Sequence, residues 1–245
     1  MILTPLYTGV HSDWHDLLST ALLAMDPAYV NNIYNTNIYY LPNITRIFAA
    51  FSQPISTIQY VLLGESPYPR VESANGYAFW DNAIQALWSA TGFSTTVNRA
   101  TSLRNWLKAL LVASGDLTTD TSQAMIARLD KHVYYTTASE FFSGMIDQGF
   151  LLLNAALIYR PKQIQFDAKQ WKPFLITILR ALLLLQPSVK LILFGRIAAQ
   201  LADDSLPCIL KCEHPYNISF ISNPDVLQFF KPFNLLRRYE NGVVR

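Results

Sequence analysis

The sequence predicts an α/β protein, a three-layer α/β/α sandwich with a central, mostly parallel four-stranded sheet. Short, nearly continuous apolar runs alternate along the chain with longer segments whose apolar residues recur at the period of a helix. Strands that are apolar on both faces are typical of a parallel sheet covered by helices on each side. The chain has 245 residues, of which 51% are hydrophobic and 15% charged, so it can form a substantial core.

Four apolar runs are the predicted strands. They are Ile58–Leu63, Phe150–Leu153, Val189–Phe194 and Leu206–Lys211. Each run is short and ends at glycine or polar residues, as expected for strands buried in the middle of a sheet.

Three segments are predicted helices because their apolar residues fall on one face at a 3.6-residue period. They are Ser102–Val112, Trp171–Leu185 and Val226–Tyr239. The longest apolar run, Phe174–Leu185, is interrupted by Thr177 and Arg180. It is shorter than the roughly 20 apolar residues that a membrane span requires, so we expect a buried helix there.

Neither a repeat nor a flexible linker divides the sequence, which predicts a single domain over residues 1–245. The polar segment Ser114–Ser139 is expected to be a surface insertion. Cys208 and Cys212 have no second pair of metal ligands at a suitable spacing, so we expect two buried small side chains and no metal site. The first residues lack the basic region of a secretory signal, which favours a soluble, intracellular protein of the cytoplasm, nucleoid or nucleus.

The charge balance excludes two classes of protein. Lys and Arg together number 19 and Asp and Glu 17, for a formal net charge of +2. A disordered acidic or basic tail would have few apolar residues and a large net charge. A nucleic-acid binder that relies on bulk positive charge is disfavoured as well, so any contact with DNA must be local.

Polar residues follow each of the four predicted strands. The first strand runs into Gly64-Glu65-Ser66-Pro67-Tyr68, the second into Asn154, the third into Gly195-Arg196 and the fourth into Glu213-His214-Pro215. Ligands of open α/β sheets bind outside the carboxyl ends of the strands. The pattern alone therefore nominates Ser66, Tyr68, Asn154 and His214 as site residues.

At these positions the sequence resembles the uracil-DNA glycosylase family. The segment 64–69, Gly-Glu-Ser-Pro-Tyr-Pro, resembles the family's Gly-Gln-Asp-Pro-Tyr-His, and 74–80, Ala-Asn-Gly-Tyr-Ala-Phe-Trp, follows at the family's distance. The segment 148–160 resembles the family's Gln-Gly-Val-Leu-Leu-Leu-Asn motif, and 214–219, His-Pro-Tyr-Asn-Ile-Ser, resembles its His-Pro-Ser-Pro-Leu-Ser motif. The matches keep the same order from about Trp14 to Tyr239, nearly the whole chain.

The resemblance implies a role for each candidate residue. Asn154 would read the edge of a uracil that has been flipped out of DNA, Phe79 would stack on it, and Tyr68 would exclude thymine. His214 would stabilise the negative charge that develops on the uracil as the glycosidic bond breaks.

The contacts to DNA would come from four further residues. Ile218 would wedge into the helix in place of the family's leucine. Ser102, Ser143 and Ser219 would hold phosphates, which positions an enzyme on DNA without reading its sequence. The implied partner is uracil-containing DNA, single- or double-stranded; neither a cofactor nor a membrane is implied, and no protein partner is indicated.

The sequence departs from the family at its catalytic carboxylate. Ser66 stands where the family has the Asp that orients the attacking water, and a serine hydroxyl carries no negative charge at neutral pH. Glu65 is the adjacent acidic residue and could take over this role. Pro69-Arg70, Trp80 and Tyr216-Asn217 also differ from the family's motifs.

Three readings of the function stay open at this point. The first is a uracil-DNA glycosylase whose activity is weakened or altered by Ser66. The second is a catalytically impaired DNA-binding or protein-interaction module on the glycosylase fold. The third is a glycosylase for another damaged base, against which the retained Tyr68, Phe79 and Asn154 argue.

Overall fold

The chain forms two compact units, each assembled from two separate segments. The computed structural model describes residues 4–34, 38–196, 208–240 and 243–244. Unit 1 comprises Met1–Trp80 and Gly149–Lys211, and unit 2 comprises Asp81–Gln148 and Cys212–Arg245. A single domain over the whole chain stays a prediction.

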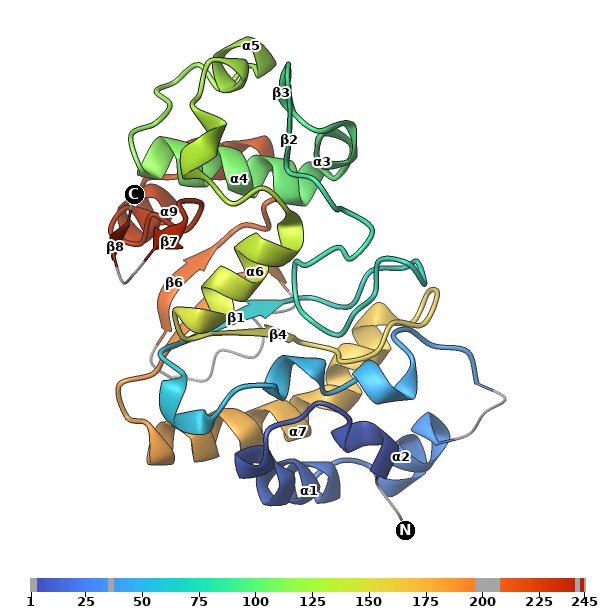
Figure 1. Ribbon diagram of the computed structural model, residues 1–245. Helices are drawn as coiled ribbons and strands as arrows, with labels where there is room; N and C mark the ends of the chain where they lie inside the picture. Colours follow the sequence, from blue (N-terminus) through green and yellow to red (C-terminus); the bar gives the residue numbers. More distant parts are fainter. Residues whose placement is uncertain (1–3, 35–37, 197–207, 241–242, 245) are drawn as a thin grey trace. The chain divides into compact units, whose positions relative to one another are not determined.

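The main feature of unit 1 is a four-stranded sheet with the strand order β4-β1-β5-β6 (Figure 1). The strands are β1 (Tyr60–Gly64), β4 (Phe150–Asn154), β5 (Lys190–Phe194) and β6 (Cys208–Cys212). β1 pairs in parallel with both β4 and β5. The predicted α/β class, with a central parallel sheet flanked by helices, is confirmed. The predicted strands are found within about two residues of their predicted ends, although Leu206 and Pro207 lie outside the described residues.

The strands β1, β4 and β5 are buried on both faces. Val61 and Leu63 of β1 belong to the large core that includes α1 (His15–Leu23) and α7 (Ile164–Leu185). Leu62 between them points to the opposite face and is buried as well. This explains why the strands are apolar at every position rather than at alternate ones.

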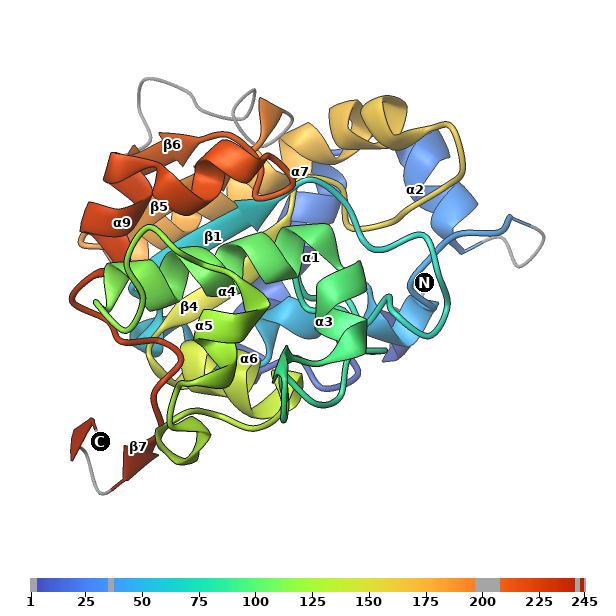
Figure 2. The ribbon, with the colours of Figure 1, turned by 90° about the horizontal axis from the view of Figure 1, so that it is seen from above.

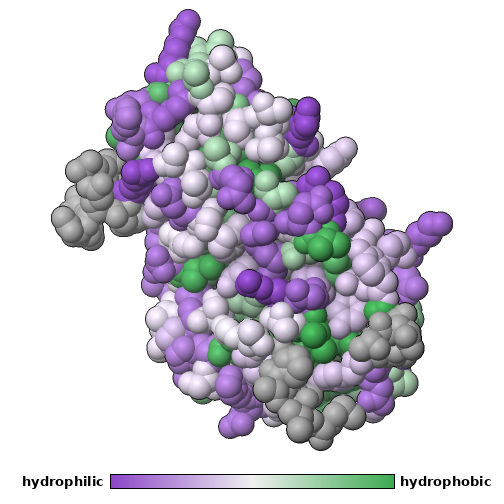
Figure 3. All heavy atoms as spheres, turned by 45° about the vertical axis from the view of Figure 1, so that its right-hand side comes forward, coloured by the Kyte–Doolittle hydropathy of each residue, from purple (hydrophilic) through white to green (hydrophobic). Residues whose placement is uncertain are grey.

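α7 begins seven residues before the predicted Trp171, because its first two turns are mostly polar and carry little apolar periodicity. Within the described part of the chain, no helix is long and apolar enough to cross a membrane. The end of α7 leaves Leu184 exposed. Apolar side chains at the surface are scattered, and the face drawn in Figure 3 carries small separate apolar areas among polar ones.

A buried ion pair anchors the segment that follows β4. Arg160 Nε lies 3.1 and 3.2 Å from the two carboxylate oxygens of Asp167, and the hydroxyl of Tyr29 donates to Oδ1 at 2.7 Å. Asp167 is fully buried. Burial and the neighbouring carboxylate raise the pKa of Tyr29, so its hydroxyl keeps the proton that it donates.

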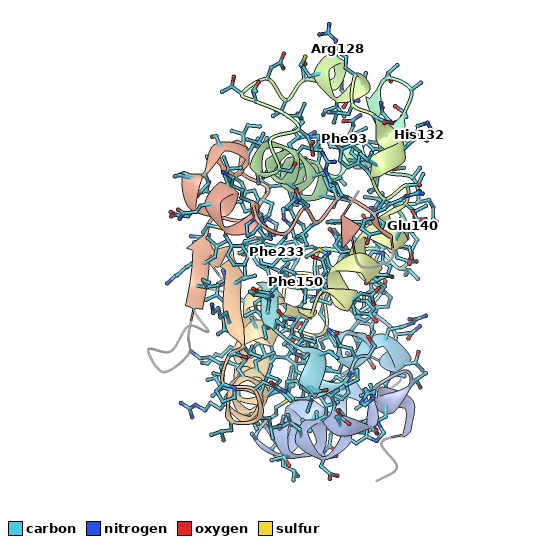
Figure 4. The ribbon with its side chains drawn as sticks, turned by 60° about the vertical axis from the view of Figure 1, so that its left-hand side comes forward. Phe93, Arg128, His132, Glu140, Phe150 and Phe233 are labelled. Carbon is cyan, nitrogen blue, oxygen red and sulfur yellow. The ribbon has the colours of Figure 1, made fainter. Side chains whose placement is uncertain are left out.

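Unit 2 is built around α4 (Thr101–Ala113), whose ends agree with the predicted helix within one residue. Trp106 of α4 packs against Phe141 and Phe142 of α6 (Ala138–Asp147) and against Phe230 of α9 (Pro224–Phe230). Figure 2 shows the ribbons of these three helices. α6 begins with a capping box in which Thr137 and Glu140 exchange hydrogen bonds with each other's backbone N–H; Figure 4 labels Glu140.

One expectation in this part of the sequence needs correction. The helix predicted over Val226–Tyr239 ends at Phe230, because Pro232 has no backbone N–H to continue the helical hydrogen bonds. The segment Ser114–Ser139 contains α5 (Gln123–Ala127) and buries Ile126 and Tyr134. That it is a surface insertion stays a prediction.

The cysteines were wrongly expected to be buried. Cys208 is exposed and Cys212 partly exposed, because β6 is the last strand in the order of the sheet and buries only Leu210. Among the described residues, no group of three His, Cys, Asp or Glu side chains is arranged to hold a metal ion. The remaining elements are α2 (Pro27–Ile33), β2 (Trp88–Ser89), β3 (Gly92–Phe93), α3 (Thr95–Arg99), β7 (Tyr239–Glu240), β8 (Val243–Val244) and short 3-10 turns. One of these turns, η7 (Ile218–Ser222), begins within the last motif.

Candidate active site

In unit 1, the ends of β1 and β4 bring an amide and an aromatic ring together. Gly64 ends β1 and pairs in register with Asn154 at the end of β4. A Cβ atom on Gly64 would lie 3.0 Å from Oδ1 of Asn154 and 3.1 Å from Cε2 of Phe79. The glycine therefore leaves room for both side chains beside the end of β1.

The amide of Asn154 has hydrogen-bonding capacity that the protein does not use. The side chain is 2% exposed, and its Nδ2 has no hydrogen-bond partner among the described residues. Buried polar groups are nearly always paired, and a buried donor without a partner costs about 1–3 kcal/mol. A buried amide donor without a protein partner can hydrogen-bond a ligand, and here it lies at the end of a strand, where ligands of α/β sheets bind.

Phe79 is held in an uncommon backbone conformation. Its φ of 63° lies in the left-handed region, which costs a non-glycine residue about 1–3 kcal/mol and is found most often at functional sites. The hydroxyl of Tyr68 donates to the carbonyl of Phe79 at 3.1 Å, and the N–H of Ala78 donates to the carbonyl of Leu152 at 3.1 Å. These bonds fix Tyr68 and Phe79 next to β4, so three predicted uracil-binding residues lie in one group.

Glu65 and Ser66 follow β1 directly. The carboxylate of Glu65 lies over Gly195 at the end of β5, where an added Cβ would come within 2.6 Å of Oε1. The carbonyl of Glu65 accepts the N–H of Ala156 at 3.0 Å. Ser66 is partly buried in the segment that leads to Tyr68. Both residues thus belong to the same strand end as Asn154.

In unit 2, the predicted catalytic histidine is held in one tautomer. Nδ1 of His214 accepts the N–H of Tyr216 at 3.1 Å, and the carbonyl of His214 accepts the N–H of Asn217 at 3.0 Å. A neutral imidazole has one protonated nitrogen, so accepting at Nδ1 places the proton on Nε2. His214 therefore presents a hydrogen-bond donor at Nε2.

Asn105, a residue that sequence reasoning did not assign to the site, holds the segment after His214. Its Nδ2 lies 2.9 Å from the carbonyl oxygen of Pro215, 3.3 Å from that of Tyr216 and 3.5 Å from that of Asn217. Asn105 is 1% exposed on α4. The signal in the sequence is an amide within the apolar face of a helix, since such a residue needs a buried partner.

The predicted DNA contacts all lie in unit 2. Ser102 is in the first turn of α4, and Ile218 and Ser219 begin η7, which packs on α4. Ile218 is 72% exposed. Ser143 is exposed on α6, next to the Phe142 side chain that packs on α4. Three of the four residues therefore lie on elements that contact each other, and Ser143 lies on a neighbouring helix.

Comparison with known proteins identifies the family of the chain. The family model described as "Uracil DNA glycosylase superfamily" matches residues 53–236. A uracil-DNA glycosylase of Pediococcus pentosaceus is 29% identical over 220 residues, which cover 86% of this chain and 82% of that protein.

Solved structures give the same result. The wild-type UNG of Nitratifractor salsuginis is 36% identical, with a TM-score of 0.88 and 97% of each chain covered. The uracil-DNA glycosylase of mimivirus is 16% identical with a TM-score of 0.56, which is a likeness of fold alone. The sequence motifs, the sheet and these matches extend over most of the chain, which belongs to the uracil DNA glycosylase superfamily.

Proposed function

We propose that the protein hydrolyses the N-glycosidic bond of uracil in DNA, as a glycosylase of base-excision repair. The observation that carries the proposal is the buried, unpaired amide of Asn154 beside the ring of Phe79. Uracil offers an O4 acceptor and an N3–H donor side by side, and an amide can satisfy both. For a uracil flipped out of the stack, these two hydrogen bonds would replace those of the lost base pair.

Phe79 and Tyr68 would shape the base site. The ring of Phe79 provides a stacking surface, and such contacts contribute about 1–3 kcal/mol per base. Tyr68, tied to the carbonyl of Phe79, would meet the C5 position and clash with the methyl group of thymine. This explains how the protein would select uracil from a base that differs by one methyl group.

His214 would stabilise the leaving group. When the bond between C1′ and N1 breaks, its electron pair stays on uracil and the charge spreads to O2. The Nε2–H donor that the Tyr216 contact enforces suits this developing charge. Removing one such donor typically lowers the rate by about 10²–10³-fold.

Ser66 and Glu65 are the candidates for the group that orients the attacking water and accepts its proton. Loss of a general base typically lowers a rate by about 10²–10⁴-fold, so a chain that relies on Ser66 alone would be slow. Glu65 supplies a carboxylate at the same strand end, beside Gly195. We propose Glu65 as the group that replaces the family's Asp.

DNA would be held by local contacts rather than by net charge. Ser102, Ser143 and Ser219 offer hydroxyl donors to phosphates, and Ile218 offers an exposed apolar wedge. Such contacts allow a chain of net charge +2 to bind single- or double-stranded DNA.

The test is release of uracil from single- and double-stranded oligonucleotides, measured as alkali-labile abasic sites. Wild type should form abasic product, and His214→Leu should reduce the rate by about 10²–10³-fold. Glu65→Gln should abolish most of the activity, and Ser66→Asp should restore it in the Glu65→Gln background. Robust turnover by Glu65→Gln would refute the role of Glu65, and DNA binding without any abasic product would favour a non-catalytic module.

A further inference from the structure

Two large apolar side chains project from the segment after His214. Tyr216 is 67% exposed and Ile218 is 72% exposed, with Asn217 between them. Trp106 and Phe220 of unit 2 are, in contrast, fully buried. A three-residue stretch that exposes two such side chains is an exception to the packing of this unit, and it needs an explanation beyond core formation.

The backbone beneath the Tyr216 ring is fixed on both sides. Its N–H donates to Nδ1 of His214 at 3.1 Å, and its carbonyl accepts from Nδ2 of Asn105 at 3.3 Å. The preceding carbonyl, that of Pro215, accepts from the same amide at 2.9 Å. An exposed ring on a fixed backbone loses little conformational freedom when it binds, which is how rigid aromatic side chains gain affinity.

A nucleobase is the ligand that fits this ring. Tyr216 donates its N–H to the histidine that we place at the uracil, and Ile218, two residues further on, is the proposed wedge into the stack. A planar aromatic group at this point can meet the face of a base adjacent to the uracil. A base in single-stranded DNA exposes that face at lower cost than a base in a duplex.

We propose that Tyr216 stacks on a nucleobase next to the flipped uracil and strengthens binding to single-stranded DNA. The inference rests on the proposed function, because DNA must be the ligand. It adds a contact that the related motif, with serine at this position, does not have. Stacking of one base on an aromatic side chain strengthens binding by about 5- to 150-fold.

The experiment measures the dissociation constant of a single-stranded oligonucleotide without uracil, and of the matching duplex, by fluorescence anisotropy. Tyr216→Ser should weaken single-strand binding by about 5- to 150-fold and duplex binding less. Tyr216→Phe keeps the ring and should bind within about twofold of wild type. Tyr39→Ser, which removes another exposed tyrosine (63%), is the matched control and should bind as wild type does.

A second readout detects the stacking itself. Oligonucleotides with 2-aminopurine on either side of the uracil should show quenched fluorescence with wild type and Tyr216→Phe, but not with Tyr216→Ser. Unchanged single-strand binding by Tyr216→Ser would overturn the inference, and so would equal losses for the Ser and Phe variants, because the hydroxyl rather than the ring would then be the contact. Tyr216→Leu, which is apolar but not planar, should fall between them.

The two proposals fail in different ways. Tyr216-dependent binding without abasic product from uracil DNA would refute the proposed glycosylase and support the stacking. Normal turnover together with single-strand binding that does not depend on Tyr216 would support the proposed glycosylase and refute the stacking.

Discussion

Replacement of Asn105 tests how the segment after His214 is positioned. Its Nδ2 serves three carbonyls, of which that of Pro215 is closest at 2.9 Å and belongs to a buried residue. A buried acceptor left without its donor costs about 1–3 kcal/mol, whereas the carbonyls of exposed Tyr216 and Asn217 can turn to water. We therefore expect Asn105→Ala to lower the free energy of unfolding by about 1–3 kcal/mol.

The same change should slow catalysis more than it weakens binding. Once the carbonyls lose their common donor, the backbone that sets the His214 ring can shift, and a misplacement of about 1 Å can lower a rate by about 10²-fold. Asn105→Ala should therefore reduce the single-turnover rate of uracil release by about 10- to 100-fold and change KM little. Asn105→Asp, which keeps the shape but turns oxygens toward three carbonyls, should be at least as slow at neutral pH.

Urea unfolding and single-turnover excision at saturating enzyme separate the two effects. The matched control is Asn98→Ala, which removes another amide donor of unit 2, bonded to the carbonyl of Phe93 at 3.1 Å. Asn98→Ala should lose stability and keep the rate of uracil release. If Asn105→Ala were destabilised but excised uracil as fast as Asn98→Ala, the positioning role would be refuted.

Two further predictions follow from close contacts. Gly64→Ala adds a methyl group 3.0 Å from Asn154 Oδ1 and 3.1 Å from the Phe79 ring, so both side chains must shift. If the shift costs the bound base the 1–3 kcal/mol typical of overpacking, kcat/KM for uracil should fall by about 5- to 150-fold. Unchanged steady-state kinetics would show that this pair does not read the base. Hydrogen bonds from the N–H groups of Thr137 and Thr136 hold the pKa of Glu140 below its ordinary value. Glu140 therefore stabilises the fold fully at any pH above its ordinary pKa, and this stabilisation is lost as the pH falls through its lowered pKa. Glu140→Gln should therefore lower the urea midpoint at pH 7 and approach wild type in acid, and a constant difference at all pH values would contradict this origin.

Much of the fold follows from short-range patterns. The strands could be predicted because apolar runs such as Val189–Phe194 are buried on both faces and end at glycine or polar residues. The helix predicted over Val226–Tyr239 is too long, and Pro232 alone indicates an earlier end. No local pattern predicts the order of the strands, in which β1 lies between β4 and β5, because this order depends on pairings between distant segments.

Some residues of the candidate site could likewise be predicted from the sequence and others could not. His214 and Asn154 could be nominated from their places after predicted strands. The contact of Asn105 with Pro215 spans 110 residues of sequence, so no local pattern indicates it. The left-handed backbone conformation of Phe79 could not be predicted from the sequence either, because the position is not a glycine, the residue that usually indicates such a conformation.

The pairing of β1 has a consequence for how the protein is made. Tyr60 pairs with Phe150 on one side and with Lys190 on the other, and both partners come much later in the chain. A nascent chain that has left the ribosome only as far as Gln148 would hold the central strand without either neighbour, with its apolar residues facing water. Contacts this far apart in sequence form slowly. During translation the chain is therefore most exposed to aggregation between the synthesis of β1 and that of β5, and chaperone binding would be of most use in that interval.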